Sequence, residues 1–347
     1  MKIGAIDLFC GIGGLTHGLI KANIDVIAGI DYDESCKYAY EENNKSQFIH
    51  KNIEEVSGQE LNQLFSDTDI KILVGCAPCQ PFSNHQKDKN NRQKHKDWGL
   101  LNEFLRLIKE TDPDIVSMEN VPILRKEDIF NDFLAGLEEQ SYHINYKIHD
   151  AQDFGVAQRR SRLVLIASKY GAIDFIEYNG KRPTVKDVIG DLPKLNSGET
   201  DKNDPIHKAS KLSELNLKRI QHSIPGGTWK SWPEELLPNC YKKKSGSTYV
   251  SVYGRMSWDD VAPTLTTQFF IYGTGRYGHP EQDRPISLRE GAMLQSFPRN
   301  YKFVEDNQQI LTSILARHIG NAVPPKLGEY IGNTILHHLR ERGVINE

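Results

Sequence analysis

Short apolar segments alternate with segments of helical periodicity over the first 170 residues of this 347-residue chain. Apolar runs at Lys2–Leu8 and Asp25–Ile30 flank Gly14–Lys21, where apolar residues recur at helical spacing. Strand, helix and strand in this order predict a βαβ unit, which joins two parallel strands. Because the alternation continues, we predict an α/β fold with a doubly wound, mostly parallel sheet that helices cover on both faces. The further predicted strands are Ile70–Val74, Asp114–Met118 and Arg162–Ala167, and the further predicted helices are Leu100–Lys109 and Glu127–Leu137.

The alternation stops after about Lys169. Pro, Gly, Ser and Lys become frequent through Gly190–Asn203 and Ile224–Gly246, which predicts a second, loop-rich region. Helical periodicity returns at Leu288–Gln295 and again at Lys326–Arg340. The last segment is amphipathic, so we expect it to pack back on the first domain.

Composition excludes several classes of protein. Apolar residues make up 38% of the chain and charged residues 26%, which is ordinary for a globular protein and excludes a disordered or fibrous one. No apolar run approaches the ~20 residues that span a bilayer, and no cleavable leader follows Met1. The five cysteines are odd in number and irregular in spacing, so we expect reduced thiols and a chain that begins at Met1 in the cytoplasm.

Charge is distributed unevenly. The formal net charge is only −3, which does not by itself indicate a partner that is a nucleic acid. Between Pro205 and Met256, however, nine basic residues face three acidic ones, so this window carries a formal charge of +6. The window includes Lys242–Lys244 and Arg255.

A glycine-rich segment, Asp7–Gly14, follows the first predicted strand. An open α/β sheet binds ligands at this edge, and glycines let a backbone approach a ligand closely, so a nucleotide-like cofactor is favoured. A dinucleotide fingerprint would need a glycine where Thr16 stands. Asp31 could accept hydrogen bonds from ribose hydroxyls, and Tyr32 could lie against a base. The alternative is a tight turn beside an acidic strand end.

Two cysteines, Cys76 and Cys79, follow the predicted strand Ile70–Val74. They fit a redox pair, half of a zinc site or one catalytic nucleophile. Zinc needs four ligands and no second pair exists, so we predict no metal. A redox pair normally precedes a helix, whereas Pro81 and polar residues follow here. We favour Cys79 as the nucleophile and Cys76 as its structural neighbour.

Six motifs in order resemble those of the DNA cytosine-5 methyltransferase family, and the resemblance spans essentially the whole chain. They are Asp7–Gly14, Pro78-Cys79-Gln80, Met118–Val121, Gln158–Arg162, Arg289-Glu290 with Leu294–Pro298, and Gly320–Pro325.

The resemblance implies S-adenosyl-L-methionine as cofactor, S-adenosyl-L-homocysteine as product and double-stranded DNA as substrate. It implies a catalytic set of Cys79, Glu119, Asn120, Arg160 and Arg162. The implied cofactor contacts are Asp7, Phe9, Cys10, Gly11, Ile12, Gly13, Gly14, Asp31, Tyr32, Asn52, Ile53, Pro78, Leu100, Asn321, Ala322 and Val323. Where the family often has an aspartate that contacts the adenine amino group, this chain has Asn52, whose carbonyl could accept the same bond.

The resemblance also implies a mechanism. The thiolate of Cys79 would add to C6 of a cytosine while Glu119 bonds N3 and the exocyclic amine. Arg160 and Arg162 would hold O2 of the base or nearby backbone, and Asn120 would brace the loop. The cytosine would be flipped out of the duplex, and the basic segment Ser83–Asp97 would close behind it.

The implied domains are a catalytic domain at 1–172, a target-recognition domain at 173–261, and a remainder at 262–347 that completes the recognition region and packs back. Basic and polar residues suited to DNA contact are Gln80, Ser83, Arg92, Lys242, Lys243 and Arg255. A monomer in bacterial restriction-modification or related defence is expected, with a restriction or defence protein as a possible partner and no membrane. Alternatives are a tRNA methyltransferase, a silent DNA-binding module and a nicotinamide oxidoreductase.

Overall fold

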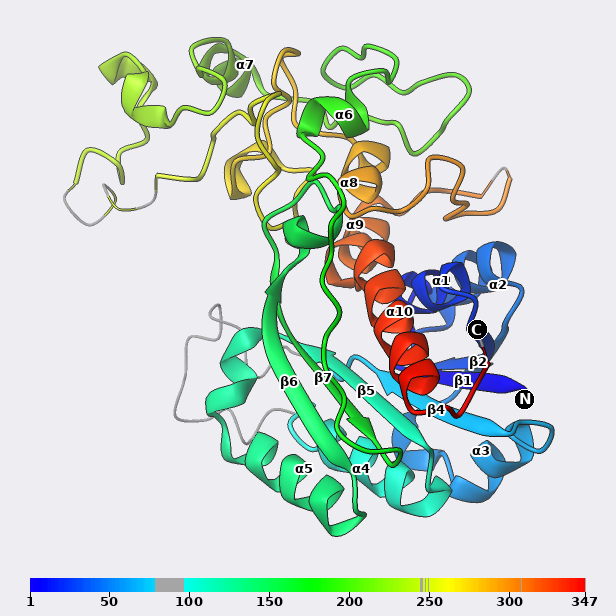
Figure 1. Cartoon of the computed structure of the whole chain (residues 1–347). Helices are drawn as coiled ribbons and strands as arrows, with labels where there is room; N and C mark the ends of the chain where they lie inside the picture. Colours follow the sequence, from blue (N-terminus) through cyan, green and yellow to red (C-terminus); the bar gives the residue numbers. More distant parts are fainter. Residues whose placement is uncertain (79–96, 244–245, 247, 249, 307, 347) are drawn as a thin grey trace. The chain divides into compact units, whose positions relative to one another are not determined.

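The computed structural model describes residues 1–78, 97–243, 246, 248, 250–306 and 308–346 (Figure 1). The chain divides into two compact units. Unit 1 comprises residues 1–154, 161–180 and 322–347, and unit 2 comprises residues 155–160 and 181–321. The chain therefore leaves unit 1 twice and returns to it twice.

Unit 1 is built on a seven-stranded sheet of order β3-β2-β1-β4-β5-β7-β6. The strands β1 to β5 pair in parallel, whereas β7 is antiparallel to both of its neighbours. Strand order therefore reverses between β1 and β4, where doubly wound sheets bind ligands. The strands are β1 Ile3–Leu8, β2 Asp25–Asp31, β3 Gln47–His50, β4 Ile70–Gly75, β5 Ile115–Asn120, β6 His143–Asp150 and β7 Ser161–Ser168.

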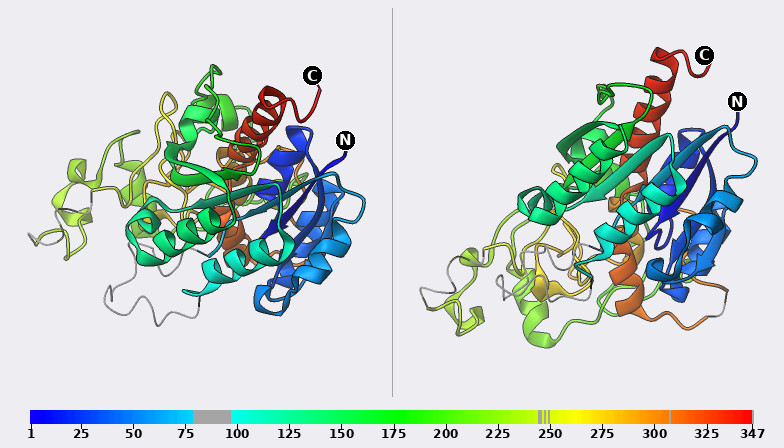
Figure 2. Two further views of the ribbon diagram at one scale, coloured as in Figure 1. Left: turned by 60° about the horizontal axis from the view of Figure 1, so that its bottom comes forward. Right: turned by 90° about the horizontal axis from the view of Figure 1, so that it is seen from below.

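Helices cover both faces of this sheet (Figures 1 and 2). Successive residues of a strand point to opposite faces, so Leu73 of β4 packs with one cluster and Ile72 and Val74 with the other. The first cluster joins the sheet to α3 (Gly58–Leu64), α4 (Leu100–Thr111) and α5 (Asp128–Glu139). The second joins it to α1 (Gly14–Lys21) and α10 (Pro325–Glu341). This arrangement confirms the predicted fold class.

The helices α1 and α10 pack unusually closely. A Cβ added at Gly18 would lie 2.2 Å from the Pro325 carbonyl oxygen, and one added at Gly328 would lie 2.8 Å from the Leu15 oxygen. Only glycine allows the two backbones this approach. The C-terminal segment therefore packs on unit 1, as its amphipathic pattern predicted.

Most predicted elements are present with shifted ends. The predicted helix Leu100–Lys109 extends to Thr111, and Asp114–Met118 becomes β5, Ile115–Asn120. The sequence analysis missed β3 and β6, which are the two edge strands. Five of the eight residues of β6 are polar, because an edge strand with an exposed side lacks the apolar run of a central one. The helix α2, Lys37–Asn44, was also missed.

Unit 2 contains short helices joined by long irregular segments, as the loss of alternation predicted. Its helices are α6 Val185–Ile189, α7 Glu214–Gln221, α8 Leu288–Leu294 and α9 Thr312–Asn321. Isolated bridges, such as Arg255 with Gly278, replace extended ladders in its described residues. A small core gathers Ile220, Trp229, Trp232, Leu236 and Tyr272. No helix among the described residues is long and apolar enough to cross a membrane.

Candidate active site

The carboxyl ends of the central strands bring the predicted motifs of unit 1 to one edge. Leu8, at the end of β1, pairs with Ile30 of β2 on one side and with Gly75 of β4 on the other. Two backbone hydrogen bonds continue these pairings beyond the strand ends: Cys10 N donates to Ile30 O, and Cys76 N donates to Leu8 O. The glycine loop, the acidic strand end and the Pro-Cys segment therefore start side by side.

The glycine loop turns through left-handed backbone. Phe9, Gly11 and Gly13 have φ values of 62°, 50° and 82°. Gly13 N donates to Cys10 O at 2.9 Å, and Gly11 N donates to Asp31 Oδ2 at 2.8 Å. A Cβ placed at Gly11 would meet no atom within 4 Å, so the space beside this backbone is open. The loop is therefore fixed by its own hydrogen bonds and exposes its backbone.

Asp7 lies buried beneath this loop and is 1% exposed. Its Oδ2 accepts a hydrogen bond from Thr16 Oγ1 at 2.7 Å, and the same hydroxyl is 3.2 Å from the Tyr40 hydroxyl. Burial raises the pKa of Asp7 to about 7; the hydrogen bond from Thr16 lowers it and the nearby charge of Asp31 raises it. Asp7 is thus a second carboxyl behind the loop, and it can take up a proton near neutral pH. Thr16, which occupies the third-glycine position of a dinucleotide loop, is its partner.

The carboxylate of Asp31 is only partly buried, at the end of β2. Its two oxygens accept the N–H groups of Gly11 and Asp33 at 2.8 and 2.9 Å. An ionised carboxylate has about four lone-pair sites, so it can accept several hydrogen bonds at once. Tyr32 beside it is 59% exposed. Both side chains are accessible for the contacts predicted with an adenosine.

Asn52 begins the short helix η2, Ile53–Glu55. Its Oδ1 accepts from Glu54 N at 3.3 Å, and its Nδ2 donates to Glu54 Oε2 at 3.0 Å. The carbonyl predicted to contact an adenine thus already accepts one bond as a helix cap. Ile53 is buried, so its predicted contact would be made by few of its atoms.

Glu119 lies at the end of β5 beside Cys76 because of strand register. Gly75 pairs with Met118 in the parallel β4–β5 ladder, so the next residues of both strands stand opposite each other. Cys76 Sγ donates to Glu119 Oε2 at 2.8 Å. Glu119 is 3% exposed, whereas Cys76 is partly buried. From the sequence, Cys76 was predicted only as a structural neighbour of the nucleophile, and its contact with Glu119 was not predicted, although Glu119 directly follows the predicted strand Asp114–Met118 and Cys76 follows Ile70–Val74 after Gly75.

Arg162 of β7 reaches the other oxygen of the same carboxylate. Its Nε lies 2.9 Å from Glu119 Oε1, and its side chain is 12% exposed. The strand β7 pairs antiparallel with β5, with Leu163 opposite Asn120, which brings Arg162 to the end of β5. A buried carboxylate thus has a cation on one oxygen and a thiol on the other.

Asn120 connects β5 to the Pro-Cys segment. Its Nδ2 donates to Ala77 O at 3.0 Å, and its Oδ1 accepts from Val121 N at 2.8 Å. Asn120 is 1% exposed, so this bond is protected from water. The contact is of the kind expected of a residue that braces the loop before Cys79.

Arg160 belongs to unit 2, two residues from Arg162 along the chain. Its guanidinium is buried and donates to Leu265 O at 3.2 Å and to Gly320 O at 2.9 Å. Arg160 therefore holds two distant segments of unit 2 together. Its predicted contact with a base stays a prediction.

The remaining predicted cofactor residues are placed in both units. Cys10, Ile12 and Val323 are buried, whereas Pro78, Leu100 and Ala322 are partly exposed. Asn321 is exposed and ends α9 in unit 2, and the chain enters unit 1 at Ala322. The predicted nucleophile Cys79 lies outside the described residues, as do Gln80, Ser83 and Arg92.

Arg255 does not fit the DNA contact that was predicted for it. It is 5% exposed and donates to the backbone oxygens of Ile220, His279 and Gln282, and it pairs with Asp283. A guanidinium used in this way cannot read a base edge without dismantling the loops around it.

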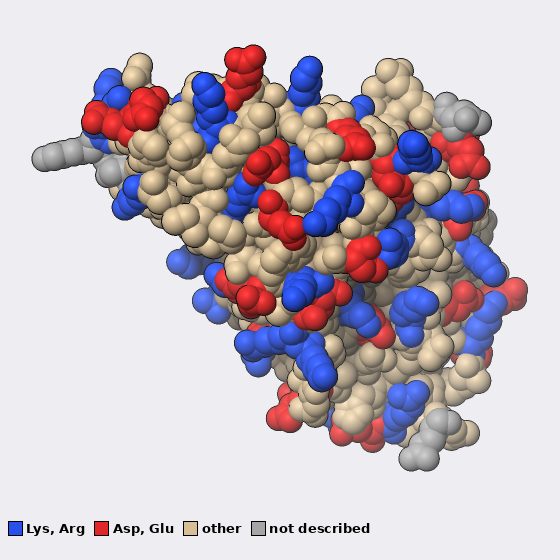
Figure 3. Space-filling model, turned by 90° about the horizontal axis from the view of Figure 1, so that it is seen from above, with Lys and Arg blue, Asp and Glu red and all other residues tan. Residues whose placement is uncertain are grey.

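Lys242 and Lys243 remain candidates for DNA contact. Both are exposed, and Lys242 lies 3.7 Å from Glu234 in a weak ion pair. Basic and acidic side chains are otherwise interspersed over the face shown in Figure 3. Charge thus supports local contacts rather than a single basic surface on that face.

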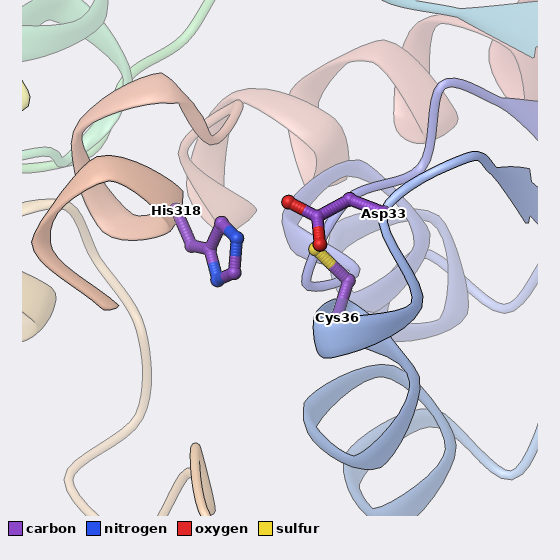
Figure 4. A group of neighbouring side chains, drawn as sticks. All are labelled: Asp33, Cys36 and His318. Carbon is purple, nitrogen blue, oxygen red and sulfur yellow. The ribbon is translucent and has the colours of Figure 1, made fainter. Parts of the chain in front are cut away.

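Asp33 and Cys36 lie just beyond Asp31 and flank a single turn (Figure 4). The Asp33 side chain accepts from Ser35 N at 3.2 Å, which caps the short helix η1, Glu34–Cys36. Cys36 is buried. His318, also drawn there, belongs to α9 of unit 2. The cap by Asp33 thus stabilises the turn that follows Asp31.

The fold and this edge define a methyltransferase-type doubly wound domain, and comparison with known proteins agrees. A family profile, C-5 cytosine-specific DNA methylase, matches residues 3–337. The chain belongs to this family, which confirms the resemblance and the class of enzyme that its motifs predicted.

Two curated relatives show how far the similarity extends. The Type II methylase M.HgiDII of Herpetosiphon aurantiacus is 53% identical over 350 residues, covering 98% of each chain. The Type II methyltransferase M1.BsuMI of Bacillus subtilis (strain 168) is 32% identical, covering 98% of this chain and 81% of its own.

Solved structures share the fold. A protein of E. coli assigned as a prophage-encoded DNA modification methyltransferase matches with a TM-score of 0.74 at 22% identity, over 98% of this chain and 100% of its own. The S. pombe Dnmt2 methyltransferase matches with a TM-score of 0.68 at 17% identity, over 98% and 100% of the two chains.

Proposed function

We propose that this enzyme transfers a methyl group from S-adenosyl-L-methionine to C5 of a cytosine in a specific sequence of duplex DNA. The observation that carries the proposal is the buried Glu119 carboxyl at the carboxyl end of the central strand β5. It lies beside the segment that leads to Cys79, and Arg162 and Cys76 contact its two oxygens. Cytosine C5 is too weak a nucleophile to react unaided, so the ring needs both a nucleophile at C6 and a partner at N3.

The residues around the glycine loop fit the cofactor. The partly buried carboxylate of Asp31 is of the kind that accepts hydrogen bonds from ribose hydroxyls, and the open backbone at Gly11 leaves room for a ligand. Exposed Tyr32 offers a ring for the adenine. When bound, S-adenosyl-L-methionine supplies an electrophilic methyl group on a sulfonium. The other groups that the reaction needs are side chains of this chain.

In the proposed reaction, the thiolate of Cys79 forms a bond to C6 of the flipped cytosine, and the ring electrons move toward N3. Glu119 in its protonated form donates to N3 and accepts from the exocyclic amine, which stabilises the charge that develops. After methylation of C5, a base such as a water molecule would take the C5 proton, and the C6–S bond would break to regenerate the Cys79 thiolate. Asn120 keeps the preceding loop in place through Ala77.

We assign the choice of target sequence to unit 2, which holds residues 181–261 of the proposed recognition region 173–261 and residues 262–321 of its continuation. The +6 window at 205–256 and the exposed Lys242 and Lys243 support phosphate contacts there. The Type II relatives support a role in restriction-modification, with a cognate endonuclease or other defence protein as partner. We expect a monomer that acts in the cytoplasm.

Bisulfite sequencing of a host that expresses the enzyme tests the proposal. The wild type should protect cytosines in one short sequence, and Cys79→Ala should protect none. Cys240→Ala, which changes an exposed cysteine of unit 2, is the matched control and should behave as wild type. If the wild-type and Cys79→Ala genomes look alike, transfer of labelled methyl to tRNA would identify an RNA enzyme instead.

A further inference from the structure

We propose that Cys76 is a positioning residue that holds the Glu119 carboxyl through both of its protonation states. The proposal rests on the proposed role of Glu119 at N3 of the base. It concerns the thiol three residues before the proposed nucleophile, which the reaction itself does not use.

Register fixes the thiol beside the carboxyl. Cys76 and Glu119 each follow a residue of the Gly75–Met118 pair in the β4–β5 ladder. Cys76 N also donates to Leu8 O, so the backbone of Cys76 is tied to β1 as well. The Cα of Cys76 is therefore fixed opposite Glu119, and its Sγ lies 2.8 Å from Glu119 Oε2.

The two neighbours of the carboxyl differ in what they can do. Arg162, whose Nε lies 2.9 Å from Oε1, has donors only and offers nothing to a proton on the carboxyl. A thiol is both a weak donor and a weak acceptor. Cys76 can donate to Oε2 when Glu119 is ionised and accept from it when Oε2 carries a proton.

This property suits a carboxyl that must change state during the reaction. A buried carboxyl loses free energy whenever one of its oxygens is left without a partner. With Cys76 in place, protonation of Oε2 reverses one hydrogen bond and breaks none. The carboxyl then keeps its orientation toward the base, and the weak bond of a thiol is readily reversed.

The test compares Cys76→Ala, which removes the partner, with Cys76→Ser, which keeps a group that donates and accepts. Cys240→Ala again serves as the control. We expect Cys76→Ala to lower kcat for labelled methyl transfer to duplex DNA about tenfold, with KM for DNA and cofactor within about twofold of wild type. Serine should restore most of kcat, and Cys76→Ser and Cys240→Ala should melt at temperatures similar to that of the wild type.

A second measurement needs no activity. The S–H stretching band of Cys76, taken from the infrared difference between wild type and Cys76→Ser, should lie at the low frequency of a bonded thiol and move up in Glu119→Gln. An unmoved band would show that the contact is absent and overturn the proposal. A wild-type kcat in Cys76→Ala, or a loss that serine does not restore, would overturn it as well. Failure of the proposed function would instead leave every variant and the wild type inactive on DNA, with the band still shifted.

Discussion

Different kinds of interaction stabilise the interior of each of the two units. Unit 1 has a continuous ladder of seven strands and apolar clusters on both sheet faces. Unit 2 has isolated bridges, and buried charged side chains bond to its backbone and to one another. In unit 1 the register of strands places the site residues, whereas in unit 2 single side chains place whole loops. A substitution should therefore act locally in unit 1 and over long distances in unit 2.

The pair Arg284 and Glu290 shows the second principle. Both are at most 1% exposed, and two hydrogen bonds of 2.7 Å join them. Burial alone would raise the pKa of Glu290, but the bonds and charge of Arg284 outweigh it and lower that pKa to about 2. Glu290 also accepts from Ser287 N and thereby begins α8.

The largest effect should come from Glu119→Gln in unit 1. The amide cannot supply a proton to N3, so we expect kcat to fall by about 10² to 10³. Single-turnover methyl transfer measures the loss. Glu139→Gln, at the exposed end of α5, is the control and should keep full activity. Full activity in Glu119→Gln would remove the residue from the reaction.

A large effect on stability should come from Arg284→Met in unit 2. The substitution leaves Glu290 buried without its cation, which costs about 3–5 kcal/mol. Three of the four tryptophans, Trp229, Trp232 and Trp258, lie in unit 2, so urea unfolding followed by fluorescence reports on that unit. The double variant Arg284→Met with Glu290→Met should lose less than Arg284→Met alone. Equal losses would show that the pair is not coupled.

A smaller effect should come from Asp7→Asn, which sharpens the comparison inside unit 1. Because the folded pKa of Asp7 is about 7 and the unfolded value is near 4, native protein holds an extra proton between these values. Stability contributed by this proton falls as pH rises from about 4 to about 7 and then levels off. Asp7→Asn should therefore gain about 2–3 kcal/mol more, relative to wild type, at pH 8 than at pH 5.

Thermal or urea unfolding at the two pH values checks this prediction. Asp25→Asn, at the exposed start of β2, is the matched control and should show no such pH dependence. A constant difference between Asp7→Asn and wild type across this range would mean that Asp7 does not titrate there.

The smallest effect should come from Lys242→Ala combined with Lys243→Ala in unit 2. If both contact phosphates, the slope of log affinity against log salt should become shallower by about two, with equal weakening on all DNA sequences. Fluorescence anisotropy over a salt series measures the slope. Lys2→Ala with Lys109→Ala removes the same charge just before β1 and in the last turn of α4, and should leave the slope unchanged. Matching slopes would exclude the two lysines from the interface.

The sequence predicted the central strands of unit 1 and the residues at their ends, because buried parallel strands are apolar runs with clear limits. It therefore placed Glu119, Asp31 and the glycine loop at one edge. It missed the bond between Cys76 and Glu119, since strand order and register are needed to see it. It also gave Arg255 to DNA, because residue type does not reveal that backbone oxygens occupy a guanidinium.

The glycine contact between α1 and α10 has a consequence for biosynthesis. The apolar face that α1 leaves on the sheet is completed by Leu327, Ile331 and Ile335, which the ribosome makes about 300 residues later. At translation rates of about 5–20 residues per second, this face stays uncovered for tens of seconds. Unit 1 can then close only after unit 2 has been synthesised. A nascent chain of this enzyme is therefore exposed to chaperones and proteases until its last helix emerges, and loss of that helix would leave α1, which follows the glycine loop, without its packing partner.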